Sequence, residues 1–335
     1  MRHQIINVGL IGLGRIGKMH AKNICEKLPL LNLKSIAGPK PDLEFIQNLG
    51  GTTLHEDAQE IISDKNIDAI IISSPTPTHF NLIKKCLRNN KHVFCEKPIS
   101  FSENEINEII DLMVIQESFV QVGLNRRFDE EFILLKEKIK EGLIGKTQII
   151  HITNHDSTIP RFKFLKSSGG MLFDLCIHDF DMLTFITGKK IKEIYVNGSV
   201  FIEPRLKDIN DIDNAIITLE LTNGVLCTID SSRQTHFGYD QRIEVFGSKG
   251  MISVDNKPNQ LFLLSDESRT IKSKIKKSFA ERYESSYVHE LEHFYKCVIS
   301  NKSPIVGPKN ILDAIHIATA GTKSLELNRP VMVER

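Results

Sequence analysis

The chain has 335 residues, of which 25% are charged and 41% belong to the hydrophobic set, and its formal net charge is +1. This length is sufficient for two domains, and the balanced charge gives no indication of nucleic-acid or anionic-membrane binding. No apolar run approaches the roughly 20 residues of a membrane-spanning helix, and the N-terminal stretch lacks the features of a signal peptide.

The six cysteines stand far apart along the sequence and form no Cys-x-x-Cys pair. This spacing argues against a zinc ribbon, an iron–sulfur cluster or a disulfide framework. We therefore expect most of them to be small buried hydrophobic residues, and we expect the protein to be cytoplasmic.

The first part of the chain alternates short apolar runs with helical patterns. Strands are predicted at 6–14, 33–38, 67–75, 91–98 and 119–125. The helical patterns that separate them lie at 18–28, 44–50, 79–90 and 103–118. Continuously apolar strands that alternate with helices predict a parallel sheet covered on both faces. We assign residues 1–122 to this α/β dinucleotide-binding (Rossmann) domain.

The rhythm changes in the second part, residues 123–335. A helix at 128–142, a strand at 147–155 and a further helix precede a series of strands. These strands are predicted at 191–201, 214–221, 224–232, 242–247, 250–255 and 260–264. Helical patterns at 287–300 and 310–325 end the chain. Successive strands without intervening helices predict an α+β domain with a large, mostly antiparallel open sheet.

GLGRIG, residues 12–17, follows the first apolar run and precedes a helical pattern. In that position a Gly-x-Gly-x-x-Gly sequence is typical of dinucleotide-binding folds. Gly12 permits the tight turn, Gly14 lets the backbone approach a pyrophosphate, and Gly17 lets helix and strand pack closely. The helix N-terminus then faces the negative charge. A glycine-rich turn without a ligand is the alternative.

The end of the second predicted strand leaves the choice between NAD and NADP open. Selectivity for NAD usually rests on an Asp or Glu at this point, which binds the ribose 2′-hydroxyl. This chain has Gly38 there instead. The missing carboxylate removes a repulsion against a 2′-phosphate, which Lys40 could attract, while Asp42 could reach back to the ribose.

The stretch DLCIHDFDML, residues 174–183, places ionisable side chains in an otherwise apolar run. Asp174, His178 and Asp181 are spaced four and three apart, so on one helix they fall within roughly a 60° arc. Asp179 points to nearly the opposite side. The pattern indicates a polar stripe on one helix face, and an ordinary solvated face is the alternative.

Several segments together resemble the Gfo/Idh/MocA family of NAD(P)-dependent oxidoreductases. They are GLGRIG, HVFCEKPIS at 92–100, SGGMLFDLCIHDFDML at 168–183, SSPTPTH at 73–79, GLNRRFD at 123–129 and IATAGTKSLE at 317–326. GYDQRIEVFGSKG at 238–250 is similar to the inositol 2-dehydrogenase branch. The resemblance implies hydride transfer from a secondary alcohol of a cyclic polyol, with oxidation of myo-inositol at its 2-position as the first expectation.

The resemblance also implies roles for individual residues. Lys97, Asp174 and His178 match the family's catalytic set. The implied substrate contacts are Arg127, Asp156, Asp181 and Tyr239, although NHDS around Asp156 departs from the family's usual polar pair. The expected cofactor contacts are Gly12, Gly14, Arg15, Ile16, Gly17, Ser74, Thr76, His79, Glu96 and Lys97, to which the residues themselves add Lys40.

The chemistry of these side chains agrees with that assignment. Oxidation of an alcohol requires removal of the hydroxyl proton, and an imidazole with an ordinary pKa of about 6.5 suits this task. Asp174 can orient the ring or bind substrate, and Lys97 can stabilise developing alkoxide charge or share the proton. This scheme needs no metal, although a histidine and an aspartate one turn apart can also bind zinc or manganese.

Other functions remain open on the sequence alone. Another inositol isomer, an aldose or a nucleotide-linked sugar would use the same hydride chemistry. A non-enzymatic dinucleotide-sensing protein would not be expected to keep both Lys97 and His178. Arg127 could be a structural ion-pair partner of Asp129 or Glu130, and Tyr239 could merely pack. The open sheet and the resemblance predict a homo-oligomer, a tetramer or a dimer.

Overall fold

Two units make up the structure, a computed structural model that describes residues 4–39 and 42–334. The first unit comprises residues 1–125 and 285–312, and the second comprises residues 126–284 and 313–335. The sequence placed 285–312 with the second domain, but in the structure this segment packs in the first unit. A helical pattern shows which face of a helix is apolar and not which sheet that face will cover.

The first unit is built on a parallel sheet of six strands in the order β3-β2-β1-β4-β5-β6. The strands are β1 (Ile6–Ile11), β2 (Leu31–Ala37), β3 (Thr53–His55), β4 (Ala69–Ile72), β5 (His92–Glu96) and β6 (Val120–Gly123). This is the strand order of dinucleotide-binding folds, in which ligands bind beyond the carboxyl ends of the strands where the order reverses.

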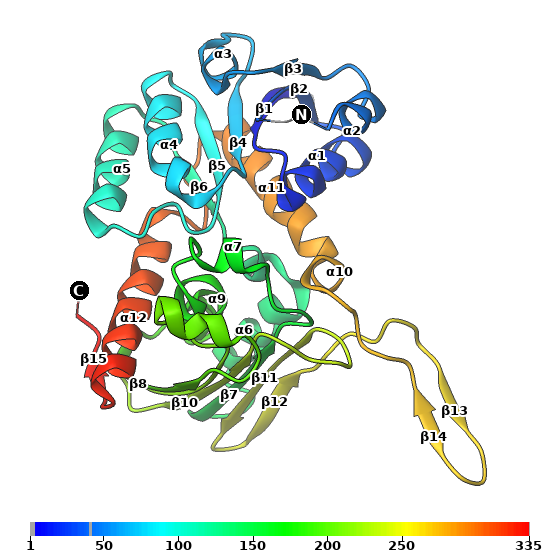
Figure 1. Cartoon of the computed structure of the whole chain (residues 1–335), viewed down its shortest axis with the longest axis vertical. Helices are drawn as coiled ribbons and strands as arrows, with labels where there is room; N and C mark the ends of the chain where they lie inside the picture. The colour runs from blue at the N-terminus through cyan, green and yellow to red at the C-terminus, as the bar shows by residue number, and fades with distance from the viewer. Residues whose placement is uncertain (1–3, 40–41, 335) are drawn as a thin grey trace. The chain divides into compact units, whose positions relative to one another are not determined.

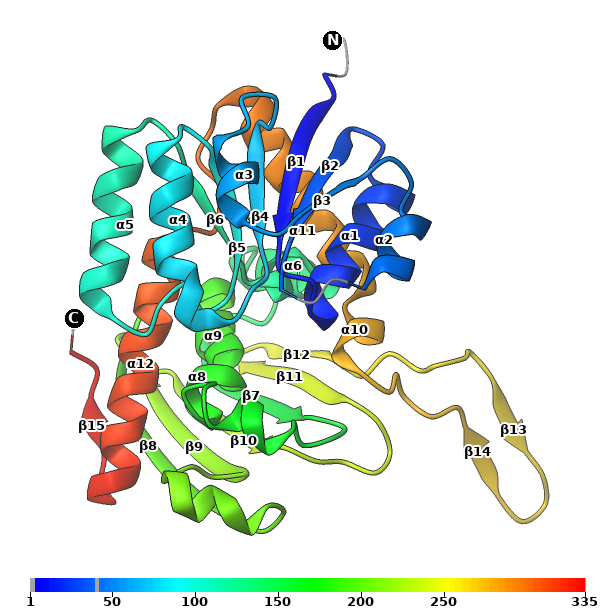
Figure 2. The ribbon, with the colours of Figure 1, turned by 45° about the horizontal axis from the view of Figure 1, so that its top comes forward.

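Helices cover the sheet of the first unit, as Figures 1 and 2 show. They are α1 (Arg15–Lys27), α2 (Leu43–Asn48), α3 (Ala58–Ser63), η1 (Thr76–Thr78), α4 (His79–Arg88), α5 (Glu103–Ile115) and α11 (Glu284–Ser300). The side chains of Leu291 and Phe294 on α11 join Ile24 of α1 and Phe94 of β5 in one buried cluster. The late helix therefore completes the core on the α1 side of the sheet.

The second unit is built on a seven-stranded mixed sheet in the order β12-β11-β7-β10-β9-β8-β15. Its strands are β7 (Thr147–His155), β8 (Ile191–Ser199), β9 (Asn214–Leu221), β10 (Leu226–Ser232), β11 (Asp240–Gly247), β12 (Gly250–Val254) and β15 (Val331–Met332). Only the pair β7 and β10 is parallel among the described pairs of this sheet. The predicted fold class, a Rossmann domain followed by a mostly antiparallel α+β domain, is confirmed.

Helices and one hairpin complete the second unit. The helices are η2 (Asn125–Phe128), which begins at the last residue of the first unit, α6 (Glu130–Lys140), α7 (Phe162–Leu165), α8 (Met171–Asp174), α9 (Ile177–Thr187), η3 (Pro204–Ile209), α10 (Phe279–Arg282) and α12 (Pro308–Leu327), whose residues 308–312 belong to the first unit. Strands β13 (Leu263–Ser265) and β14 (Thr270–Lys272) form the hairpin, which extends away from the sheet in Figure 1.

The predicted helix through residues 174–183 is not continuous. α8 ends at Asp174 and α9 begins at Ile177, because the carbonyl of Met171 accepts hydrogen bonds from the backbone N–H groups of both Leu175 and Cys176. The second of these bonds spans five residues, which places one extra residue in the turn. A stripe calculated for one regular helix therefore does not describe this segment.

No described helix is long and apolar enough to cross a membrane.

Candidate active site

The glycine turn of the first unit lies between β1 and α1. Gly12 has a φ of +101°, and a Cβ there would lie 2.6 Å from the backbone nitrogen of Ser74. A Cβ on Gly17 would lie 2.1 Å from the carbonyl oxygen of Gly12, whereas a Cβ on Gly14 would meet nothing within 4 Å. The turn thus requires glycine at two positions for its own packing, while Gly14 lies against open space.

The predicted cofactor contacts after β4 adjoin this turn. The Ser73 hydroxyl donates to the carbonyl of Gly12 at 2.9 Å, which ties the two loops together. Ser74 and Thr76 are half-buried, and the Ser74 hydroxyl lies 2.6 Å from that of Thr78. The carboxyl ends of β1 and β4 are neighbours in a parallel sheet, so residues that are distant in sequence meet at the same edge.

The end of β2 differs in part from the expectations for it. Asp42 accepts a hydrogen bond from the backbone of Phe45 at the start of α2 and pairs with the Lys18 ammonium at 2.5 Å. The Lys18 hydrogen bond is the main cause that lowers the pKa of the Asp42 carboxyl. Asp42 is therefore committed to capping and to Lys18, and Lys40 lies outside the described residues.

The Glu96-Lys97-Pro98 motif begins at the last residue of β5, and the peptide bond between Lys97 and Pro98 is cis. The buried ring of His20 lies 2.7 Å from the Glu96 carboxylate. The buried ring of His79 lies 2.9 Å from the carbonyl oxygen of Pro98 and 2.7 Å from that of Ser74. His79, predicted as a cofactor contact, thus joins two loops of the protein itself.

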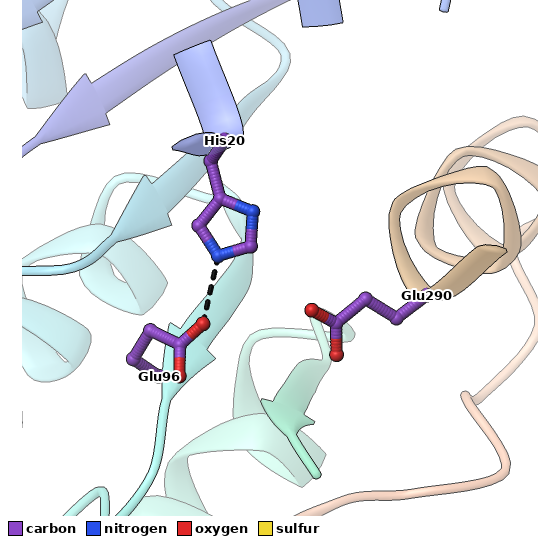
Figure 3. Close-up of side chains that lie close together, drawn as sticks. All are labelled: His20, Glu96 and Glu290. Atoms are coloured by element: carbon purple, nitrogen blue, oxygen red, sulfur yellow. Dashed lines mark hydrogen bonds and ion pairs between the residues drawn. The ribbon is translucent and has the colours of Figure 1, made fainter. Parts of the chain in front are cut away.

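One group of described residues has ligand atoms close enough together to suggest a metal. His20, Glu96 and Glu290 have such atoms within 4.8 Å of one another, and Figure 3 shows these three side chains. However, the His20 ring nitrogen and the Glu96 oxygen are hydrogen-bonded at 2.7 Å. Two ligands bound at 2.0–2.2 Å around one tetrahedral zinc ion stand about 3.4 Å apart. The arrangement therefore fits a shared proton better than a metal ion.

In the second unit, the segment 171–183 leaves two ionisable side chains partly exposed. Asp174 and His178 are half-buried, whereas Asp179, Asp181 and Cys176 are buried. The two accessible residues belong to different short helices, and both are in the predicted catalytic set. A carboxylate and an imidazole are the groups that general acid–base chemistry requires.

Arg233 is a buried residue that contacts the candidate site and that no sequence pattern indicated. Its guanidinium is fully buried, donates to the Asp174 carboxylate at 3.1 Å and lies 3.8 Å from Asp211. Asp211 in turn accepts a hydrogen bond from the backbone N–H of Met171, the first residue of α8. These contacts fix both ends of α8 and thereby the direction of Asp174. A lone arginine at the end of β10 carries no pattern that would have indicated this role.

Two predicted substrate contacts bind each other. Arg127 donates to both carboxylate oxygens of Asp181, at 2.8 and 2.6 Å, and both side chains are buried. The alternative of a structural ion pair named Asp129 or Glu130 as the partner of Arg127, and the structure gives Asp181 instead. Asp129 pairs with Arg282 at 2.8 Å.

A second buried network surrounds Tyr239. Arg126 donates to Asp179 at 2.5 Å and to the Tyr239 hydroxyl at 3.1 Å, and Asn154 donates to the other oxygen of Asp179. Burial raises the pKa of Asp179, while Arg126 and the Asn154 amide oppose the rise. Burial also raises the pKa of Tyr239 to about 12, so that its hydroxyl stays neutral. Tyr239 is only 4% exposed.

The remaining predicted site residues lie next to the ends of helices and strands. Asp156 directly follows β7 and is half-buried, and its backbone N–H donates to Ser232 at 2.9 Å. Arg15 is exposed and Ile16 half-buried at the start of α1. The glycine turn, with open space at Gly14 and an uncapped helix start, fits a dinucleotide;.

Both parts of the chain match family models. The oxidoreductase family with an NAD-binding Rossmann fold matches residues 6–124, and the GFO/IDH/MocA C-terminal domain matches residues 132–253. The myo-inositol 2-dehydrogenase of Thermotoga maritima is 38% identical over 331 residues, which are 98% of this chain and 99% of that protein.

Solved structures agree with these matches. The crystal structure of a probable dehydrogenase from Thermotoga maritima has a TM-score of 0.95 at 38% identity, over 98% of this chain and 99% of that chain. Scyllo-inositol dehydrogenase from Lactobacillus casei, with bound cofactor NAD(H) and scyllo-inositol, has a TM-score of 0.91 at 27% identity, with coverage of 98% and 99%. The chain therefore belongs to the GFO/IDH/MocA family of oxidoreductases, and its first unit is the NAD-binding Rossmann domain of that family.

Proposed function

We propose that the protein oxidises a secondary alcohol of a cyclic polyol with NAD, and that its substrate is myo-inositol, oxidised at the 2-position to the 2-keto inosose. The observation that carries this proposal is the partial exposure of Asp174 and His178 in a segment whose other ionisable side chains are buried. The 38% identity to a myo-inositol 2-dehydrogenase over nearly the whole chain supports the choice of substrate.

His178 acts as the general base in this proposal. Its ring is half-buried, so it can meet a substrate hydroxyl and still exchange protons with solvent. An imidazole has an ordinary pKa close to neutral pH and can remove the hydroxyl proton as the alcohol becomes a ketone. When bound, the nicotinamide accepts the hydride from the same carbon.

Asp174 orients the substrate or the His178 ring, and Arg233 holds Asp174 in place. The charge-assisted hydrogen bond from the buried guanidinium fixes the direction of the carboxylate, which a solvated surface aspartate would lack;. Lys97 supplies positive charge for the developing alkoxide. Arg127 and Asp181 contribute to the substrate site by supporting α9, because each already satisfies the charge of the other.

The glycine turn and the loop after β4 bind the dinucleotide. The N–H groups at the start of α1 face the pyrophosphate, and Gly14 allows the backbone to approach it;. Gly38 leaves the ribose without the usual acidic partner. The family's Rossmann domain is described as NAD-binding, and we propose NAD over NADP on that basis.

A second candidate substrate is scyllo-inositol. The Lactobacillus casei protein with bound scyllo-inositol has the same fold at 27% identity. The isomers differ only in the configuration of one hydroxyl, so the same catalytic groups can serve either. Aldoses and nucleotide-linked sugars remain alternatives within the same chemistry.

The protein is further proposed to act as a homo-oligomer, a tetramer or a dimer, in the cytoplasm. On the sheet of the second unit, Met251, Phe246, Ile149 and Leu226 are exposed and stand in register across four neighbouring strands. A row of apolar side chains on an open face is a typical self-association surface. Six free cysteines suit a reducing compartment;.

The test is the appearance of reduced nicotinamide, followed by ultraviolet absorbance, with NAD⁺ or NADP⁺ and a panel of polyols at mildly alkaline pH. Turnover of myo-inositol with NAD⁺ and identification of the 2-keto product would establish the proposal. A strong preference for scyllo-inositol or for an aldose would reassign the substrate. Turnover with NADP⁺ alone would overturn the choice of cofactor.

A further inference from the structure

Lys97 stands between two residues that are each held by a buried histidine. On one side, the His20 ring lies 2.7 Å from the carboxylate of Glu96. On the other side, the His79 ring lies 2.9 Å from the carbonyl oxygen of Pro98. The two histidines come from different helices, α1 and α4, so two separate elements of the first unit contact the motif.

His20 joins the motif to the glycine turn. It lies on α1, three residues after Gly17, and its side chain is fully buried. Its ring packs edge-on against Phe94 at 5.2 Å and Tyr287 at 6.0 Å between centroids. These contacts leave the ring little freedom, so the hydrogen bond to Glu96 is geometrically fixed.

Glu290 completes the surroundings of Glu96. Its carboxyl points toward His20 and Glu96 from α11 (Figure 3), it is fully buried, and its oxygens have no hydrogen-bond partner among the described residues. Burial, with a further contribution from the Glu96 charge, raises the pKa of Glu290 well above its ordinary value. Of the two carboxyl groups, the Glu96 carboxyl is therefore the one that is hydrogen-bonded to the His20 ring.

His79 joins the motif to the loop after β4. Its second ring nitrogen lies 2.7 Å from the carbonyl oxygen of Ser74, beside the glycine turn. A carbonyl oxygen only accepts, so both bonds form together only when the ring carries two protons. Burial lowers the pKa of His79, and the Glu96 charge and the two carbonyls oppose that effect. The doubly protonated ring bonds both loops, and the neutral ring, which has a single N–H, donates to one of the two carbonyls;.

We propose that His20 and His79 are positioning residues that fix Lys97 relative to the two cofactor-binding loops. Each histidine links a residue beside Lys97 to an element that contacts the dinucleotide in the proposed function. The inference rests on that function, in which Lys97 faces the reacting hydroxyl. Displacement of a reacting group by about 1 Å can lower a rate by about 100-fold, so such links have catalytic weight.

The experiment compares substitutions that keep or remove each contact. His20→Gln retains an amide donor near the position of the ring nitrogen, and His20→Leu does not. At His79, Asn mimics the nitrogen that faces Pro98, and Gln mimics the one that faces Ser74. His92→Leu is the matched control. The His92 ring stacks on Phe119 at 4.2 Å between centroids and stands at the start of β5, whereas Glu96 stands at its end.

His20→Leu is expected to lower kcat about 10- to 100-fold, with KM and the NADH dissociation constant changed less than about threefold. His20→Gln should recover part of the loss, and His79→Asn should be more active than His79→Gln. His92→Leu should leave kcat unchanged. Wild-type kcat in folded His20→Leu, or a loss of NADH binding that accounts for the whole effect, would overturn the inference.

Lys97→Ala separates this inference from the proposed function. If Lys97 takes part in catalysis, its removal lowers kcat, and adding His20→Leu to that variant lowers kcat little further. Full activity of Lys97→Ala would remove the catalytic role itself. The reactivity of the Lys97 amine toward an acylating reagent, measured by peptide mass spectrometry, reports its position independently of turnover. Equal reactivity in the wild-type protein and His20→Leu would contradict the positioning role.

Discussion

Asp181 is the residue at which structural and substrate-binding roles can be separated most directly. Its carboxylate is 2% exposed and receives two hydrogen bonds from Arg127. Asp181→Asn leaves the arginine charge buried without a counterion, which typically costs about 3–5 kcal/mol. We expect a large fall in the thermal unfolding midpoint. A normal midpoint with a raised KM would instead assign Asp181 to substrate binding.

His178 is expected to carry the proton transfer. His178→Ala should lower kcat by about 10²–10⁴-fold, the usual contribution of a general base, and should leave NADH affinity largely unchanged. Steady-state turnover and the fluorescence of bound NADH measure the two quantities. His151→Ala, which removes a ring that contacts Thr228 on the open sheet face, is the control. A parallel loss of NADH affinity in His178→Ala would contradict the catalytic assignment.

The buried carboxyl of Glu290 is expected to make the folded protein less stable as the pH rises. Its pKa is raised in the folded chain above the ordinary 4.5, so between those values the folded state binds a proton that the unfolded state has released. Stability from this group is therefore complete in acid and falls as pH rises through the folded-state pKa. Glu290→Gln, which cannot ionise, should raise the thermal midpoint in alkaline buffer and leave it nearly unchanged near pH 4.

Glu292→Gln is the control for that experiment, since Glu292 is only half-buried on the same helix. It should shift the midpoint equally little at both pH values. A Glu290→Gln midpoint that follows the wild-type curve throughout the pH range would show that the buried carboxyl has another source of compensation.

The acidic residues of 171–183 show how far residue-level prediction reached. The sequence correctly drew attention to this segment as a mixture of polar and buried positions. It could not separate Asp174, which reaches the surface, from Asp181, which is buried. That difference depends on Arg233 and Arg127, two cations from distant parts of the chain. Such pairings arise only when the second unit is assembled.

At the scale of elements, two alanine substitutions in the glycine turn should have different effects, one on thermal stability and the other on NADH binding. Gly17→Ala would place a methyl group 2.1 Å from the Gly12 carbonyl oxygen, and Gly14→Ala would place one in open space. Overpacking of this kind typically costs about 1–3 kcal/mol, so Gly17→Ala should lower the thermal midpoint. Gly14→Ala should fold normally and bind NADH about tenfold more weakly or worse, because its methyl occupies the path of the pyrophosphate.

Thermal unfolding and NADH titration of both variants test this contrast. Tight NADH binding by Gly14→Ala would show that the dinucleotide does not approach the turn at that residue.

Element prediction succeeded where one periodicity dominated. β7 coincides with the predicted strand at 147–155, and its buried residues, Ile150, Ile152 and Asn154, alternate with more exposed ones. β3 and α3 were not predicted, since their short, half-exposed sequences carry weak patterns. The break between α8 and α9 was also missed, because one additional backbone hydrogen bond to Met171 leaves no compositional trace.

For the whole molecule, the apolar row on the second unit leads to a prediction about assembly. Leu226 and Phe246 are 57% and 45% exposed and stand on either side of Ile149 in the sheet. The double substitution Leu226→Glu with Phe246→Glu should reduce the mass measured by sedimentation, because buried like charges oppose association. Val114→Glu, at a 76% exposed apolar position on α5, should not. An unchanged mass in the double variant would place the interface elsewhere.

The division of the chain shows the limit of prediction at this scale. The first change of rhythm, near residue 122, lies close to the end of the first segment of unit one at residue 125. The return of residues 285–312 was not predicted, because their apolar faces could cover either sheet. Only the contacts of Leu291 and Phe294 with the first core settle the matter.

This return has a consequence for synthesis on the ribosome. The first unit consists of two chain segments, and the ribosome synthesises the 159 residues numbered 126–284 between them. Until α11 leaves the exit tunnel, Phe94 and Phe119 lack the Phe294 ring that later packs against both. Domains usually fold in order as they emerge. In this protein, part of the apolar surface of the nascent Rossmann sheet stays uncovered until α11 has been synthesised. A chaperone that binds such surfaces would therefore act before translation ends.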